Sequence, residues 1–238
     1  MSDLLGALGQ AWPRLLAYPG GFSAVLAMLV LARIRGIRRL DPPSAARIID
    51  LLFPLCAISL LPLPFATSFP YGLDLLTAQV LLLWPLLRQT ATERQRAPCL
   101  ARYLPMLLAG IVLVSATTTF DLSGWLRWPT EPVRQITVVL GIVAWIVALP
   151  RVTPPTTDVA LAGSSLGLLL IGSLPLIAAL NSTALGRVGL PGMTMVLAVS
   201  LSALALIGAE RLPPPIASLL VGLALVSAGI TAIWIAFD

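Results

Sequence analysis

The sequence contains no histidine and no lysine, and it has only two cysteines among its 238 residues. Cys56 lies inside an apolar run and Cys99 lies in a basic segment, so we expect neither a disulfide between them nor a metal site. No clustered carboxylates take the place of the missing imidazoles, so the sequence offers no evident general acid–base pair. We therefore expect a chain that anchors, conducts or shapes a cavity, and that is a non-catalytic subunit if it belongs to an enzyme.

Charged residues are also scarce, at 11% of the chain, whereas a soluble domain has about a quarter. Apolar residues make up 58%, and the mean hydropathy is +0.97. This composition predicts an all-α, polytopic integral membrane protein. The arginines behind the net charge of +5 lie at the ends of apolar runs and not along one basic face, so the expected partners are lipid and other subunits, not nucleic acid.

Apolar runs divide the chain into eight predicted transmembrane spans within a single domain, residues 1–238. The expected spans are residues 15–32, 48–65, 73–87, 104–118, 136–149, 159–180, 193–209 and 216–237. Several are shorter than the roughly 20 residues that cross a bilayer as a helix, so flanking residues must contribute. Residues 1–14 are predicted to form an interfacial helix with Trp12 at headgroup level.

Two basic segments, residues 33–47 and 88–102, set the predicted orientation. With the N-terminus outside, the inner loops hold eleven arginines and the outer loops hold four. Positive charge in short loops collects on the cytoplasmic side, so both basic segments are predicted to be cytoplasmic loops. The expected location is the inner (cytoplasmic) membrane of a bacterium or archaeon.

Acidic residues near the spans are few, and each lies close to a predicted helix end. Asp50 follows Arg47 by three positions, so the two share a helix face and can pair. Asp50 and Asp158 are the candidates for a coupling or ion-pair role, because an ionisable residue at a span is a functional hypothesis. For Asp74, Asp158 and Glu210 a solvated end or a helix cap is the favoured interpretation.

Small residues recur along the sixth predicted span. Gly163, Gly167 and Gly172 are expected to allow close packing of a neighbouring helix.

The first fifty residues carry a family resemblance. Tyr18-Pro19-Gly20-Gly21 opens a span that leads to the basic turn Arg33-Ile34-Arg35-Gly36-Ile37-Arg38-Arg39, then to Asp41-Pro42-Pro43 and a second helix bearing Asp50. This stretch resembles the subunit 1 family of respiratory complex I, and more closely the corresponding membrane subunit of energy-converting, formate-hydrogenlyase-type hydrogenases. The resemblance implies eight spans and an external N-terminus. The family carries glutamates around its fifth and sixth spans, where this chain has only Asp158 between them.

The resemblance implies a membrane-anchor subunit that docks soluble redox subunits and helps to form a quinone- or proton-coupling cavity. The docking residues would be arginines of the first basic segment, which can make charge-assisted hydrogen bonds to acidic partners: Arg33, Arg35, Arg38, Arg39 and Arg47. Electron transfer would belong to the partners, because this chain has no ligand set for haem or an iron–sulfur cluster. We expect no cofactor bound by this chain itself, with a quinone at most at an interface.

A small transporter or channel component is the alternative hypothesis. It predicts carboxylates or broken helices that meet near the middle of the membrane. Prolines in the second span, among them Pro54 and Pro62, fit a broken helix, but the second half of the chain has no matching feature. A lipid-modifying enzyme is less well supported, because no catalytic constellation is present.

Overall fold

The computed structural model describes residues 22–41, 48–63, 74–89, 93–183 and 191–237, and side chains are described for most of them. The described residues are helical, with no strand among them. The helices are α2 (Phe22–Ile34), α3 (Ile48–Ser59), α4 (Leu75–Gln89), α5 (Glu93–Thr117), the 3₁₀ turn η2 (Gly124–Leu126), α6 (Pro132–Val152), α7 (Val159–Ser182), α9 (Pro191–Glu210) and α10 (Pro214–Phe237). Each of the eight predicted apolar runs therefore overlaps one α-helix.

Four of these helices are long and apolar enough to cross a membrane. They cover Pro132–Val152, Val159–Ser182, Gly192–Glu210 and Pro214–Thr231. The other four apolar helical segments have 10–17 residues, so at about 1.5 Å per residue they do not cover the roughly 30 Å of a bilayer core. The prediction of an all-α membrane protein is supported, and the count of eight spans stays a prediction.

The second basic segment is mostly helix, which corrects the prediction of a loop over residues 88–102. Helix α4 continues to Gln89 and α5 begins at Glu93. Hydropathy marked only the apolar part of α5, whereas Arg, Gln, Glu and Ala are good helix formers whatever their polarity. The first basic segment likewise begins inside α2. Residues 42–47 and the predicted interfacial helix, residues 1–14, lie outside the described residues.

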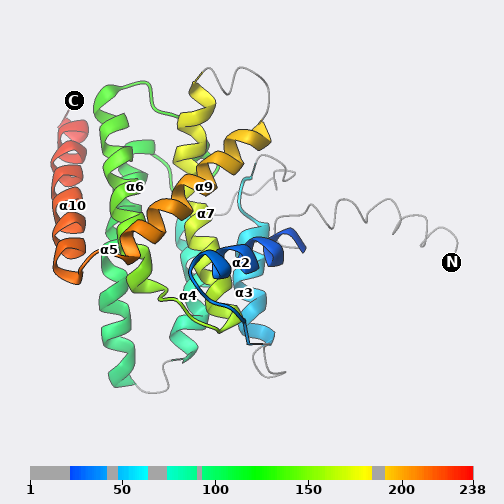
Figure 1. Ribbon diagram of the computed structural model, residues 1–238. Coiled ribbons are helices and arrows are strands. Elements are labelled where there is room, and N and C mark those ends of the chain that lie inside the picture. The colour runs from blue at the N-terminus through cyan, green and yellow to red at the C-terminus, as the bar shows by residue number, and fades with distance from the viewer. Residues whose placement is uncertain (1–21, 42–47, 64–73, 90–92, 184–190, 238) are drawn as a thin grey trace, which may run out of the picture.

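Helix α7 is the centre of the bundle (Figure 1). Residues 160–175 of α7 are all buried, and α2, α3, α4, α6 and α9 pack around it. A helix that is apolar on every side is stable only when it is surrounded. Helices α5, α6 and α10 lie side by side along one flank, with α10 outermost (Figure 1).

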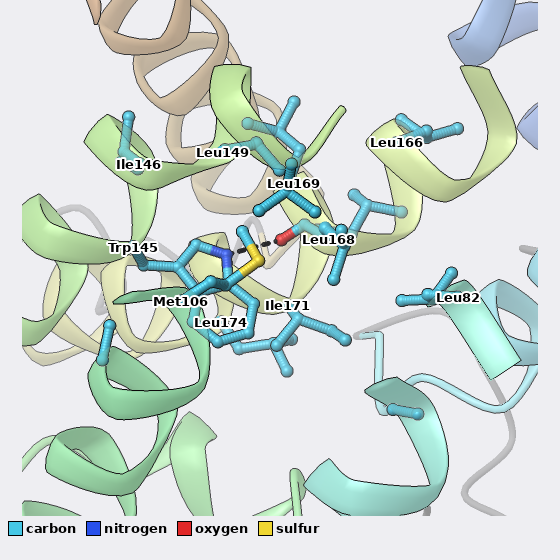
Figure 2. Packing of buried hydrophobic residues seen from close by; sticks show 14 of the residues in the cluster. Leu82, Met106, Trp145, Ile146, Leu149, Leu166, Leu168, Leu169, Ile171 and Leu174 are labelled. Carbon is cyan, nitrogen blue, oxygen red and sulfur yellow. Dashed lines mark hydrogen bonds between the residues drawn. The ribbon is translucent and has the colours of Figure 1, made fainter. Parts of the chain in front are cut away.

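Glycines let the neighbours approach α7 closely, as the sequence predicted. A Cβ atom on Gly167 would lie 2.3 Å from a methyl group of Leu82 on α4, and one on Gly172 would lie 2.5 Å from Cδ1 of Trp145 on α6. Trp145 is fully buried, and its Nε1–H donates to the carbonyl oxygen of Leu168 at 2.9 Å (Figure 2). The indole therefore fills the space beside the glycine and satisfies its only polar group.

Contacts between distant segments define two ends of the bundle. At one end, the backbone of Asp41 pairs with residues Thr157 and Asp158, and Nη2 of Arg151 donates to the carbonyl oxygen of Pro214 at 2.6 Å. We call this the arginine end; it holds residues 35–41, 153–158 and 211–213, in the lower half of Figure 1. The opposite end holds the connection from α5 to α6.

Candidate functional site

Arg35 is the centre of a buried polar cluster at the arginine end. Gly36, with φ at +81°, ends α2, and two hydrogen bonds close the turn, from the Gly36 amide to the Arg33 carbonyl at 3.0 Å and from the Ile37 amide to the Ala32 carbonyl at 2.9 Å. Arg35 stands immediately before this glycine, and its side chain is only 3% exposed. The left-handed turn at Gly36 thus ends α2, and Arg35, between the helix and the glycine, points its side chain into the bundle.

The Arg35 guanidinium bonds to three other helices or their ends. Its Nε lies 2.5 Å from a carboxylate oxygen of Glu210, which closes α9. Nη1 donates to Ser165 Oγ on α7 at 2.7 Å, and Nη2 donates to the Thr153 carbonyl after α6 at 2.6 Å. The Thr153 hydroxyl lies 3.2 Å from Ser165 Oγ. This cluster, which we call the Arg35 cluster, ties α2, α6, α7 and α9 together by charge-assisted hydrogen bonds.

An apolar groove lies directly above the Arg35 cluster, between α2 and α9, with α7 as its floor. Its volume is about 330 Å³, within the ~300–1,000 Å³ range of small-molecule sites. The lining is apolar except for Ser200: Ala27, Val30, Leu31, Ile34, Leu166, Leu169, Val199, Ser200, Ala203, Leu204 and Ile207. Val30, Ile34 and Leu204 are also exposed, so the groove opens onto an apolar lateral surface. We call it the α2–α9 groove.

Exposed arginines gather at the arginine end. Arg38, Arg39 and Arg211 lie within it and Arg33 lies two positions before it, and Arg102 on α5 is also exposed. None of them has an ion-pair partner among the described residues. At the opposite end, Arg134 pairs with Glu131 at 2.7 Å, and Asp74 and Asp121 are nearby. The two ends therefore differ in charge, with the excess of cations at the arginine end.

The predicted docking arginines fall into two groups. Arg33, Arg38 and Arg39 are exposed, whereas the Arg35 side chain is only 3% exposed and bonds within its cluster, so a partner protein cannot reach it. Arg47 lies outside the described residues. The geometry thus retains three of the five arginines as surface groups.

The predicted acidic residues are all engaged inside the chain. Asp50 pairs with Arg88 on α4 at 2.9 Å, while its predicted partner Arg47 lies outside the described residues. Asp158 caps α7 by accepting from the amides of residues 160 and 161, and Asp74 accepts from the Thr77 amide at 2.7 Å. Both caps confirm the favoured interpretation. For Glu210 that interpretation is wrong, because its carboxylate pairs with Arg35.

Ser165 and Thr153 are members of the Arg35 cluster that the sequence did not reveal. Helix α7 has three buried hydroxyls, at Ser164, Ser165 and Ser173, and among the described residues Ser164 and Ser173 bond to their own helix, at the Ala160 and Leu170 carbonyls. A serine in a buried apolar helix can satisfy itself in that way. The sequence therefore offered no means to tell which of the three meets a guanidinium.

A polar depression of about 510 Å³ lies at the opposite end, over the connection from α5 to α6. Its acidic groups are partly engaged, since Asp121 accepts from the amide and the hydroxyl of Ser123 at 3.0 and 2.6 Å. Among the described residues, no group of three His, Cys, Asp or Glu side chains could hold a metal ion.

Comparison of the chain with protein-family models, with curated proteins and with solved structures finds no match. The resemblance of the first fifty residues to the complex I and hydrogenase membrane subunits therefore stays a prediction. Chemically, the arginine end can bind anionic groups and acidic surfaces.

Proposed function

We propose that this chain is the membrane-anchor subunit of a redox assembly of the complex I or membrane-bound hydrogenase type, and that its arginine end docks an acidic soluble subunit. The observation that carries this proposal is the exposure of Arg33, Arg38 and Arg39 together at one end of a bundle with membrane-like helices. The resemblance of the same segment to those subunits supports it.

The charge balance of the arginine end favours an acidic partner. Three of the carboxylates of this end, Asp50, Asp158 and Glu210, are held by Arg88, by the α7 cap and by Arg35. The exposed cations are therefore not neutralised by them. A surface of one sign steers a partner of the opposite sign and fixes its orientation.

The proposal includes eight spans with an external N-terminus and the arginine end in the cytoplasm of a bacterium or archaeon. The excess of arginines at that end supports this orientation through the positive-inside rule. Four of the eight helices are long and apolar enough to span alone. The other four, whose apolar segments have 10–17 residues, would reach the interfaces with flanking residues, or would lie behind longer helices.

A quinone fits the proposal only at an interface with a partner. The α2–α9 groove has one polar lining side chain, Ser200, so it offers no pair of donors for two quinone carbonyl oxygens. We therefore assign no quinone chemistry and no proton transfer to the described residues of this chain. Oxidation and reduction would take place in the soluble subunits.

The test is the double substitution Arg38→Ala with Arg39→Ala, followed by mild extraction of the tagged protein from its native membrane and mass spectrometry of what remains bound. Exposed ion pairs contribute about 0.2–1 kcal/mol each, so binding of the soluble subunit should weaken roughly two- to thirty-fold. Raising the salt should weaken binding of the soluble subunit by the wild type and reduce its difference from the variant, because screening weakens the pairs that the substitution removes.

The matched control is Arg127→Ala with Arg134→Ala, which removes two cations from the opposite end. This variant should keep the soluble subunits bound. Recovery of wild-type chain alone, or only with copies of itself, would overturn the anchor proposal and favour the small transporter or channel component. Equal retention by the two double variants would show that Arg38 and Arg39 do not dock the partner.

A further inference from the structure

Each wall of the α2–α9 groove ends in an exposed arginine. On α2, Val30 lines the edge of the groove, and the exposed Arg33 lies three positions further along, beside that edge and outside the lining. On α9, Ile207 lines the groove, and Arg211 follows four positions later, just beyond the helix end. Each of the two helices that form the walls thus carries one exposed arginine close in sequence to its lining residues, toward the arginine end.

On its inner side the groove is bounded by a buried ion pair and by apolar side chains, so a charged part of a ligand would find no free partner charge there. Arg35 and Glu210 pair with each other below it and are only 3% and 17% exposed. Its floor is made by Leu166 and Leu169 of the central helix. A ligand can therefore bury only an apolar part in the groove, and any anionic part must remain outside, at Arg33 and Arg211.

We propose that the α2–α9 groove binds an acyl chain of an anionic glycerophospholipid, whose phosphate lies between Arg33 and Arg211. The apolar lining complements the acyl chain, and the two arginines complement the headgroup. Basic sites beside transmembrane helices recognise anionic lipid headgroups in this way. Arg33 also belongs to the proposed docking surface, so the two proposals are tested with different pairs: Arg33 with Arg211 for lipid, and Arg38 with Arg39 for docking.

The size of the groove argues against a protein occupant. At about 330 Å³ it accepts a small molecule, whereas a helix with its side chains is about 10 Å across and would need a wider channel. A free phosphate would meet the arginines but would leave the apolar walls uncovered. A lipid satisfies both parts of the site.

The experiment measures lipid retention by the purified, delipidated full-length chain with native mass spectrometry. The probes are phosphatidylglycerol and phosphatidylcholine with identical acyl chains. The wild-type chain should retain one phosphatidylglycerol in preference to phosphatidylcholine. Arg33→Gln with Arg211→Gln should weaken phosphatidylglycerol retention by ~30-fold, because each arginine near an anionic lipid contributes about a fivefold factor.

The apolar half of the site is tested separately with Ser200→Trp, which fills the groove from its exposed rim. This variant should lose both lipids. If it fails to fold, as judged by thermal unfolding, Ala203→Phe fills the same groove from α9. Arg127→Gln with Arg134→Gln is the control for lost charge and should retain lipid as the wild type does.

Three results would overturn the proposal. They are equal retention of the two lipids by the wild type, unchanged retention after Arg33→Gln with Arg211→Gln, and retention by a folded variant with a filled groove. Displacement of the bound lipid by millimolar inorganic phosphate would identify a simple anion site instead. A chain that binds lipid as expected but releases no partner after the Arg38 and Arg39 substitutions would separate this proposal from the docking function.

Discussion

Arg35 shows how a single charged side chain can be buried in this bundle. Its Nε, Nη1 and Nη2 atoms each have a partner, namely Glu210, Ser165 and the Thr153 carbonyl. A buried charge is tolerated when it is paired and its remaining hydrogen-bonding groups are satisfied. Removing one partner should lower the free energy of unfolding, because the other charge then stays buried and unpaired.

We predict that Arg35→Ala lowers the free energy of unfolding by about 3–5 kcal/mol, the usual cost of breaking a buried ion pair from one side. The loss should appear as a lower midpoint of thermal unfolding in detergent. Glu210→Ala should have a similar effect, because it leaves the guanidinium unpaired. The double variant should lose less than the sum of the two.

Arg134→Ala provides the comparison at an exposed pair. Its partner Glu131 is 59% exposed, so this substitution should cost about 1 kcal/mol or less. Equal destabilisation by Arg134→Ala and Arg35→Ala would contradict the structural role of the Arg35 cluster.

At the residue scale, local interactions were predictable and distant ones were not. A solvated end or a helix cap was the favoured interpretation for Asp158, and its cap could be foreseen because a helix cap depends only on the next few residues. Glu210 was assigned the same role, yet its partner Arg35 is 175 positions away in the sequence. No periodicity or spacing indicates a contact of that length, so the buried cluster became visible only in the structure.

At the element scale, α7 depends on small residues where other helices cross it. Gly172 leaves room for the Trp145 indole, and the indole in turn donates to the Leu168 carbonyl on the same helix (Figure 2). Interiors are packed too closely to absorb an added methyl group without movement. The tryptophan and the glycine are therefore a matched pair.

We predict that Gly172→Ala destabilises the protein by about 1–3 kcal/mol, the typical cost of overpacking. The new Cβ would lie 2.5 Å from Cδ1 and 2.8 Å from Nε1 of Trp145, so the ring must shift and its hydrogen bond must lengthen. Thermal unfolding measures the effect.

Gly222→Ala is the matched control on α10, where a Cβ would meet nothing within 4 Å. It should be neutral or stabilising by up to about 1 kcal/mol, because alanine is the better helix former. A loss as large as that of Gly172→Ala would contradict the packing argument.

The sequence predicted the helices better than their ends. Apolar runs marked each of the eight, because burial in lipid or in the bundle demands the same residues. The start of α5 was missed, since Glu93 and the arginines that follow are helical without being apolar. Hydropathy locates the part of a helix that leaves water, and not the part that continues into it.

At the scale of the whole molecule, the arginine end and the opposite end differ in charge, and this difference predicts the orientation. Cysteine labelling tests it. In a background with Cys56 and Cys99 replaced by Ser, Thr130→Cys should react with a membrane-impermeant maleimide in intact bacterial cells. Pro155→Cys, at the arginine end, should react only after lysis, because positive loops stay inside.

Both positions are exposed in the fold, so a difference in labelling reports the membrane side and not burial. Reversed labelling would place the arginine end outside and would exclude docking of a cytoplasmic subunit.

The separation of Arg35 and Glu210 by 175 positions also has a consequence for biogenesis. Arg35 leaves the ribosome long before Glu210 has been synthesised. Arg35, at the end of α2, therefore has no ion pair with Glu210 until α9 has been made and inserted. A nascent chain that stops before α9 keeps a cation with no carboxylate beside it. Membrane proteases should degrade such truncated chains faster than chains in which α9 is complete.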